Sequence, residues 1–134
     1  MTPELRTKSI HKPIELRDGY RISVMSRHTL NDGITPDTLI TPESFSYWMK
    51  ELAPPLKLIG SYYKRSLDWT EFEKEYLEFL KNPEQNSKIL EIIELALVQR
   101  VTLLCVEETP EHCHRRLLAE ECKRINPDLI LTVR

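Results

Sequence analysis

The sequence predicts an α/β fold, a three-layer arrangement in which a small, mostly parallel central sheet of about four strands is flanked by helices. The first observation is the apolar run Val101–Val106, which has no polar alternation and is typical of a strand buried on both faces. The second is the strongly apolar helical segment Glu84–Gln99 that precedes it. The third is the succession that follows, a helix at His114–Arg124 and a strand at Leu129–Val133. Such alternation is typical of parallel crossover connections.

The earlier part of the chain predicts two short strands and then helices. The strands are expected at Leu5–Ile10 and Tyr20–Met25. A helix is expected to begin near Pro42, because proline is tolerated at the first helical position. Its apolar face would be formed by Phe45, Trp48, Met49 and Leu52. The next elements are a short helix or turn at Leu56–Tyr63 and a helix at Trp69–Lys81.

Length and composition predict one domain over residues 1–134, of an ordinary globular class. The net charge of −2 argues against a protein coated in positive charge for wrapping nucleic acid. We expect no membrane association, because no apolar run approaches the roughly 18 residues of a membrane span and the first residues lack a signal-peptide core. Three cysteines that cannot all pair within the chain favour a reducing, cytoplasmic location.

Several segments together resemble the domain of unknown function 488 family, and especially its short single-domain branch. The resemblance is carried by Leu103–Glu107, Cys113–Arg115, Leu118–Glu120, the W-x-x-x-L-A-P stretch at Trp48–Pro54 and the W-x-x-F-x-x-x-Y stretch at Trp69–Tyr76. It extends roughly from Lys8 to Leu131. This resemblance implies a family but supplies no established reaction.

A candidate site lies at the Cys-His-Arg junction between the apolar strand and the next helix. In open α/β sheets, ligands bind beyond the carboxyl ends of the strands. Cys113 would lie at the first turn of its helix, where unpaired N–H groups and the helix dipole favour a thiolate. His114 or His112 would serve as acid and base, and Arg115 would grip an anionic group with two donors.

The end of the second strand supplies further candidates, Arg27 and His28. Relatives often carry an acidic residue before this arginine, and Ser26 stands in its place here. We therefore expect Glu107 to be the nearest carboxylate that can act as a general base. The candidate catalytic residues are Cys113, His114 and Glu107. The candidate ligand-binding residues are Arg115, Arg27, His28 and His112.

A purely structural interpretation of the same junction stays open, with a buried Cys113, a capping His114 and an ion-pairing Arg115. Cys105 and Cys122 are expected in the core. A metal site is not predicted, because adjacent side chains point in different directions and the sequence has no C-x2-C or H-x3-H pair. No cofactor is predicted, since glycine-rich phosphate-binding motifs are also missing from the sequence.

Whether the protein is an enzyme therefore stays open at this point. The first hypothesis is a small enzyme or binder with an anion site for a phosphate-bearing or nucleotide-like small molecule. The alternative is a non-enzymatic module that binds nucleic acid through the basic N-terminal region and the cluster Tyr62–Arg65. The sequence is compatible with a monomer or a homodimer.

Overall fold

A parallel β-sheet forms the centre of the computed structural model, which describes residues 2–30 and 32–134. In this part of the chain the sheet has five strands, in the order β3-β2-β4-β1-β5, and every neighbouring pair is parallel. The strands are β1 (Glu4–Ser9), β2 (Tyr20–Ser23), β3 (Tyr47–Trp48), β4 (Arg100–Cys105) and β5 (Leu131–Thr132). Because β4 pairs with β2 on one side and β1 on the other, its apolar sequence is explained by burial.

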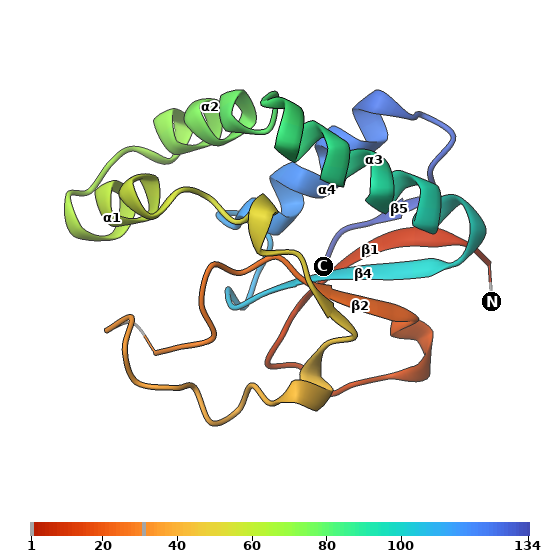
Figure 1. Cartoon of the computed structure of the whole chain (residues 1–134), viewed down its shortest axis with the longest axis horizontal. Coiled ribbons are helices and arrows are strands. Elements are labelled where there is room, and N and C mark those ends of the chain that lie inside the picture. Colours follow the sequence, from red (N-terminus) through yellow and green to blue (C-terminus); the bar gives the residue numbers. More distant parts are fainter. Residues whose placement is uncertain (1, 31) are drawn as a thin grey trace.

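The helices lie on one side of this sheet, as Figure 1 shows. They are α1 (Leu56–Lys64), α2 (Trp69–Phe79), α3 (Pro83–Val98) and α4 (His114–Ile125). Helices α3 and α4 contact β1 and β4 directly, and α2 packs on α4. The opposite side is covered by the segments that carry the short 3-10 helices η1 (Leu16–Asp18) and η2 (Pro42–Ser44). The predicted α/β class is confirmed, with one strand more than expected.

The prediction of a helix that begins near Pro42 is wrong. The chain makes only the single turn η2, becomes extended at Phe45, forms β3 and then makes a second short turn, η3 (Lys50–Leu52). Main-chain bonds explain the difference, since Ser46 N–H donates to the Arg21 carbonyl at 2.7 Å and Met49 N–H to the Ser23 carbonyl at 2.8 Å. Pairing with β2 therefore overrides the helical spacing of the apolar residues.

The remaining helices lie close to their expected positions. The segment that could be a short helix or a turn is the regular helix α1, and the helix predicted from Trp69 ends two residues early, at Phe79. None of the helices in the described residues combines the length and apolar character needed to cross a membrane.

Candidate functional site

The carboxyl end of β4 and the amino end of α4 bring two thiols and an imidazole together. Cys105 is the last residue of β4, Cys113 is the N-cap of α4 and His114 is the first residue of that helix. The two sulfur atoms and a ring nitrogen of His114 all lie within 4.8 Å of one another. All three side chains are buried, and both thiols are free. We call these residues the thiol cluster.

The orientation of the His114 ring is fixed by the main-chain carbonyl of Val24, the residue that follows β2. Its Nε2 lies 2.7 Å from the carbonyl oxygen of Val24, and because a carbonyl only accepts, Nε2 carries the proton and donates it. In the neutral ring, Nδ1 is then the acceptor, and it lies 3.6 Å from Cys105 Sγ. The geometry therefore aims a proton acceptor at the Cys105 thiol.

The pKa values of the two thiols are shifted in opposite directions. A hydrogen bond from Cys113 lowers the pKa of the Cys105 thiol, although burial opposes this shift. The charge of Arg115 and the main-chain N–H groups of Val106 and Glu107 lower the pKa of Cys105 further. Burial raises the pKa of the Cys113 thiol well above its usual range, and the neighbouring Cys105 adds to this effect. The expectation of a lowered pKa at Cys113 is thus reversed, and Cys105 is the more acidic thiol.

Arg115 lies inside the protein with no exposed surface. Its Nε and Nη2 donate to the carbonyl of Arg134 at 3.2 and 3.1 Å, and its Nη1 donates to the carbonyl of Glu107 at 2.8 Å. Nη1 also lies 3.3 Å from Cys113 Sγ. The two-pronged grip that the sequence suggests for a bound ligand is therefore made on the main-chain oxygen of Arg134.

Glu107 lies beside the thiol cluster but its carboxylate is engaged elsewhere. It accepts a hydrogen bond from the hydroxyl of Tyr63, an exposed residue of α1. Burial of the hydroxyl raises the pKa of Tyr63, and the bond to Glu107 and the charges of Cys105 and Cys113 raise it further. In α1 it is the neighbouring Tyr62 that packs against the core.

The other predicted ligand-binding residues lie around this centre without joining it. His112 is exposed and stacks on Trp69, with ring centroids 4.8 Å apart. His28 lies between Phe45 and Trp48, and its Nε2 is 2.7 Å from the Ser23 hydroxyl oxygen. Burial lowers the pKa of His28, which favours a neutral ring.

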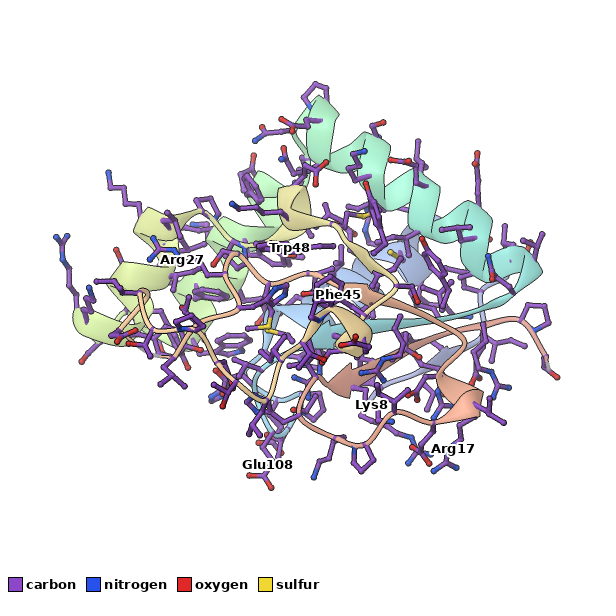
Figure 2. The ribbon with its side chains drawn as sticks, turned by 60° about the horizontal axis from the view of Figure 1, so that its bottom comes forward. Lys8, Arg17, Arg27, Phe45, Trp48 and Glu108 are labelled. Atoms are coloured by element: carbon purple, nitrogen blue, oxygen red, sulfur yellow. The ribbon has the colours of Figure 1, made fainter. Side chains whose placement is uncertain are left out.

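Arg27 projects from the loop after β2, and its Nη1 donates to the carbonyl of Gly33 at 3.0 Å. Figure 2 shows it on the opposite side of the molecule from Lys8 and Arg17. Together with Ser26 and Lys50 it lines a surface depression of about 310 Å³. The structure thus brings Cys113, His114, Arg115 and Glu107 together and leaves Arg27, His28 and His112 in separate surroundings.

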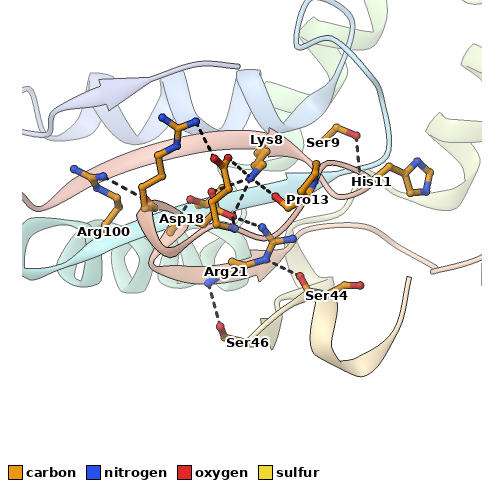
Figure 3. A network of polar contacts seen from close by, with 12 residues as sticks. Lys8, Ser9, His11, Pro13, Asp18, Arg21, Ser44, Ser46 and Arg100 are labelled. Carbon is orange, nitrogen blue, oxygen red and sulfur yellow. Dashed lines mark hydrogen bonds and ion pairs between the residues drawn. The ribbon is translucent and has the colours of Figure 1, made fainter. Parts of the chain in front are cut away.

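The basic N-terminal region is largely neutralised within the fold, as Figure 3 shows. Lys8 Nζ lies 3.0 Å from the carboxylate of the buried Asp18 and 2.9 Å from that of Glu15. Arg21 Nη1 lies 2.6 Å from the same Asp18. These cations therefore stabilise the layer below the sheet, and they are not presented to a phosphate backbone.

The aromatic–basic cluster Tyr62–Arg65 is also divided between core and surface. Tyr62 packs edge-on against Trp69 at 5.6 Å and tilted against Phe72 at 5.1 Å. Tyr63 is held by Glu107, while Lys64 and Arg65 are exposed. A row of free aromatic faces for stacking bases is therefore not formed here.

The two sulfur atoms and the ring nitrogen of the thiol cluster are also ligands for soft metal ions. Among the described residues, this cluster is the group of three side chains that lie close enough together to hold a metal ion. A structural zinc site requires four ligands. The nearby carboxylate of Glu107 is bound to Tyr63, so the cluster supplies three of the four.

Comparison with known proteins places this chain in a family. The family model described as the active DUF488-N3 subclade matches residues 5–125, which is most of the chain. The chain belongs to the DUF488 family. It is also similar to the uncharacterized protein YeaO of Escherichia coli (strain K12), with 29% identity over 117 residues, 87% of this chain and 94% of that protein. No solved structure matches. The family suggested by the sequence motifs is thereby confirmed.

Cys105 is the residue of this candidate site that the sequence analysis assigned to the core. It reads as one more apolar residue in the strand that it ends. Its position at the carboxyl end of a central parallel strand was the available signal, because that is where ligands approach such sheets.

Proposed function

We propose that this DUF488 protein is a small thiol-dependent enzyme in which Cys105 is the nucleophile and His114 the proton acceptor. The observation that carries the proposal is the 3.6 Å approach of His114 Nδ1 to Cys105 Sγ, with the opposite ring nitrogen bound to the Val24 carbonyl. A nucleophile, a base and a group that orients the base are the three parts that covalent catalysis requires.

The chemistry begins with transfer of the Cys105 thiol proton to Nδ1 of His114. The imidazolium that forms is stabilised because Nε2–H already donates to a carbonyl. Main-chain N–H groups of Val106 and Glu107 support the sulfur in its charged form. The thiolate then attacks an electrophilic carbon of the substrate, and the imidazolium returns its proton to the leaving group.

We propose an anionic small molecule, such as a nucleotide, as the substrate class. The support is the positive end of the α4 dipole, which begins at His114 and so favours negative charge at the cluster. A reducing cytoplasm, as the sequence suggests, would keep both thiols free. The nucleic-acid alternative has less support, because its basic and aromatic residues are bound within the fold.

The test is the pH dependence of iodoacetamide labelling, with each cysteine followed by peptide mass spectrometry. Cys105 is expected to react first, with an apparent pKa below about 8.5, the value of a free thiol. Cys122, whose pKa burial raises to about 12, is the internal control. His114→Gln should slow the labelling of Cys105 and leave that of Cys122 unchanged.

Two further measurements address the substrate. Inorganic phosphate or adenosine monophosphate should protect Cys105 from labelling if the site accepts anions. A burst of product from p-nitrophenyl acetate, lost in Cys105→Ser, would show that the thiolate forms a covalent intermediate. Labelling of Cys105 that is no faster than that of Cys122 in the folded protein would overturn the proposed nucleophile.

A further inference from the structure

Cys113 donates a hydrogen bond to the nucleophile but does not itself react in the proposed catalysis, and its sulfur belongs to the same cluster. Its sulfur lies within 4.8 Å of Cys105 Sγ, and the two residues belong to different elements joined by the loop that follows β4. As the N-cap of α4, Cys113 has extended backbone angles, φ −133° and ψ 138°, and so stands outside the regular helix. A sulfur–sulfur bond of about 2.05 Å requires these atoms to approach further.

We propose that Cys105 and Cys113 form a redox-active dithiol, which hydroperoxides convert to an intramolecular disulfide. The inference rests on the nucleophilic Cys105 of the proposed function and adds a modification of the same site. Pairs of this kind join a thiolate that reacts first to a second thiol that resolves the product. The cluster supplies both members side by side.

The first step consumes one hydroperoxide. With hydrogen peroxide, the Cys105 thiolate attacks one peroxide oxygen, the oxygen–oxygen bond breaks, and the leaving hydroxide takes the proton held by the His114 imidazolium to become water. Cys105 is then a sulfenic acid, oxidised by two electrons, and the peroxide is reduced. The charge arrangement favours this order, since Cys105 is the more acidic thiol.

In the second step, the Cys113 thiol loses its proton and its sulfur attacks the Cys105 sulfur. The sulfur–oxygen bond breaks, a second water leaves and the disulfide remains. Arg115 is placed to assist, because its Nη1 lies 3.3 Å from Cys113 Sγ and stabilises negative charge as that thiol ionises. His114 Nδ1, within the same 4.8 Å cluster, is the acceptor for the proton.

The disulfide would have two consequences for the proposed enzyme. It removes the nucleophile, so activity would stop under oxidising conditions and return when a dithiol reductant is added. It also protects Cys105, because a sulfenic acid with no resolving thiol is oxidised further to the irreversible sulfinic acid. This gives Cys113 a role that a core residue would not have.

The experiment treats the full-length, chelator-washed protein with hydrogen peroxide and maps its peptides without reduction. We expect one linked peptide pair containing Cys105 and Cys113, loss of two of the three free thiols, and an unmodified Cys122. Dithiothreitol should restore all three thiols. The variant Cys122→Ser is the matched control, and it should still form the linked pair.

The variant Cys113→Ser separates this inference from the proposed function. Labelling of Cys105 by iodoacetamide should stay faster than that of Cys122, because the serine hydroxyl can still donate a hydrogen bond to the Cys105 sulfur. Peroxide, however, should drive Cys105 to a dimedone-reactive sulfenic acid and then to the sulfinic acid. If wild-type Cys105 labels rapidly but peroxide gives the sulfinic acid with Cys113 still free, the dithiol is overturned and the nucleophile stands. If the labelling of Cys105 shows no lowered apparent pKa, the nucleophile of the proposed function is itself overturned.

Discussion

Replacing Arg115 by alanine should cost this protein a large part of its stability. The guanidinium donates to two partly buried main-chain oxygens, those of Glu107 and Arg134, and contacts the sulfur of Cys113. Hydrogen bonds to charged groups contribute about 1.5–3 kcal/mol each, so the two carbonyl partners together predict a loss of about 3–6 kcal/mol. Domains of this size are stable by only about 5–15 kcal/mol.

Urea unfolding monitored by circular dichroism measures this loss directly. A ligand-binding arginine would behave differently, because its removal would weaken anion protection of Cys105 and leave the free energy of unfolding nearly unchanged. Arg17→Ala is the matched control, since that side chain and the carboxylate of its partner Glu15 are both exposed. A loss of less than about 1 kcal/mol for Arg115→Ala would refute the structural role.

Three further changes test other parts of the fold. Gly19→Ala should destabilise by about 1–3 kcal/mol, because Gly19 has φ +64° and an added Cβ would lie 2.3 Å from the Arg100 carbonyl oxygen. The pKa of Asp18 is lowered, because hydrogen bonds from charged and main-chain donors outweigh the effect of burial. The stability that Asp18 contributes to the fold is therefore present above about pH 4 and is lost as the pH falls through its folded-state pKa. Tyr76→Phe should cost about 1–2 kcal/mol, because the buried hydroxyl donates to the Leu52 carbonyl at 2.6 Å.

Each of these predictions has a clear contrary result. Gly60→Ala in α1 is the control for Gly19, and it should not destabilise, since nothing lies within 4 Å of the added Cβ. Asp18→Asn should be less stable than wild type at neutral pH, with a difference that narrows in acid. A constant difference between pH 7 and pH 3 would contradict the assigned ion pairing. Thermal unfolding of Tyr76→Phe at the wild-type midpoint would contradict the buried hydrogen bond.

Much of the second half of the fold was predictable because its signals are local. The apolar run of β4, the helix that precedes it and the helix that follows it are each long enough for composition to decide their type. The segment from Pro42 to Leu52 was not predictable in this way. Its apolar residues recur at helical spacing, and only main-chain pairing with β2 makes it extended.

The sequence by itself determined the family and the α/β class, and it pointed to the strand–helix junction that carries the proposed site. Only the tertiary structure decided which residues can act there. The pKa values of the thiols depend on neighbours brought together from β4, the loop that follows it and α4, so they reverse the expected order of Cys113 and Cys105. The role of Arg115 was decided in the same way, because the carbonyls that it binds lie on the loop after β4 and beyond β5. The spacing of residues along a chain indicates which side chains could form a site. Their burial and their contacts in the folded protein decide the pKa of a thiol and the partner of an arginine.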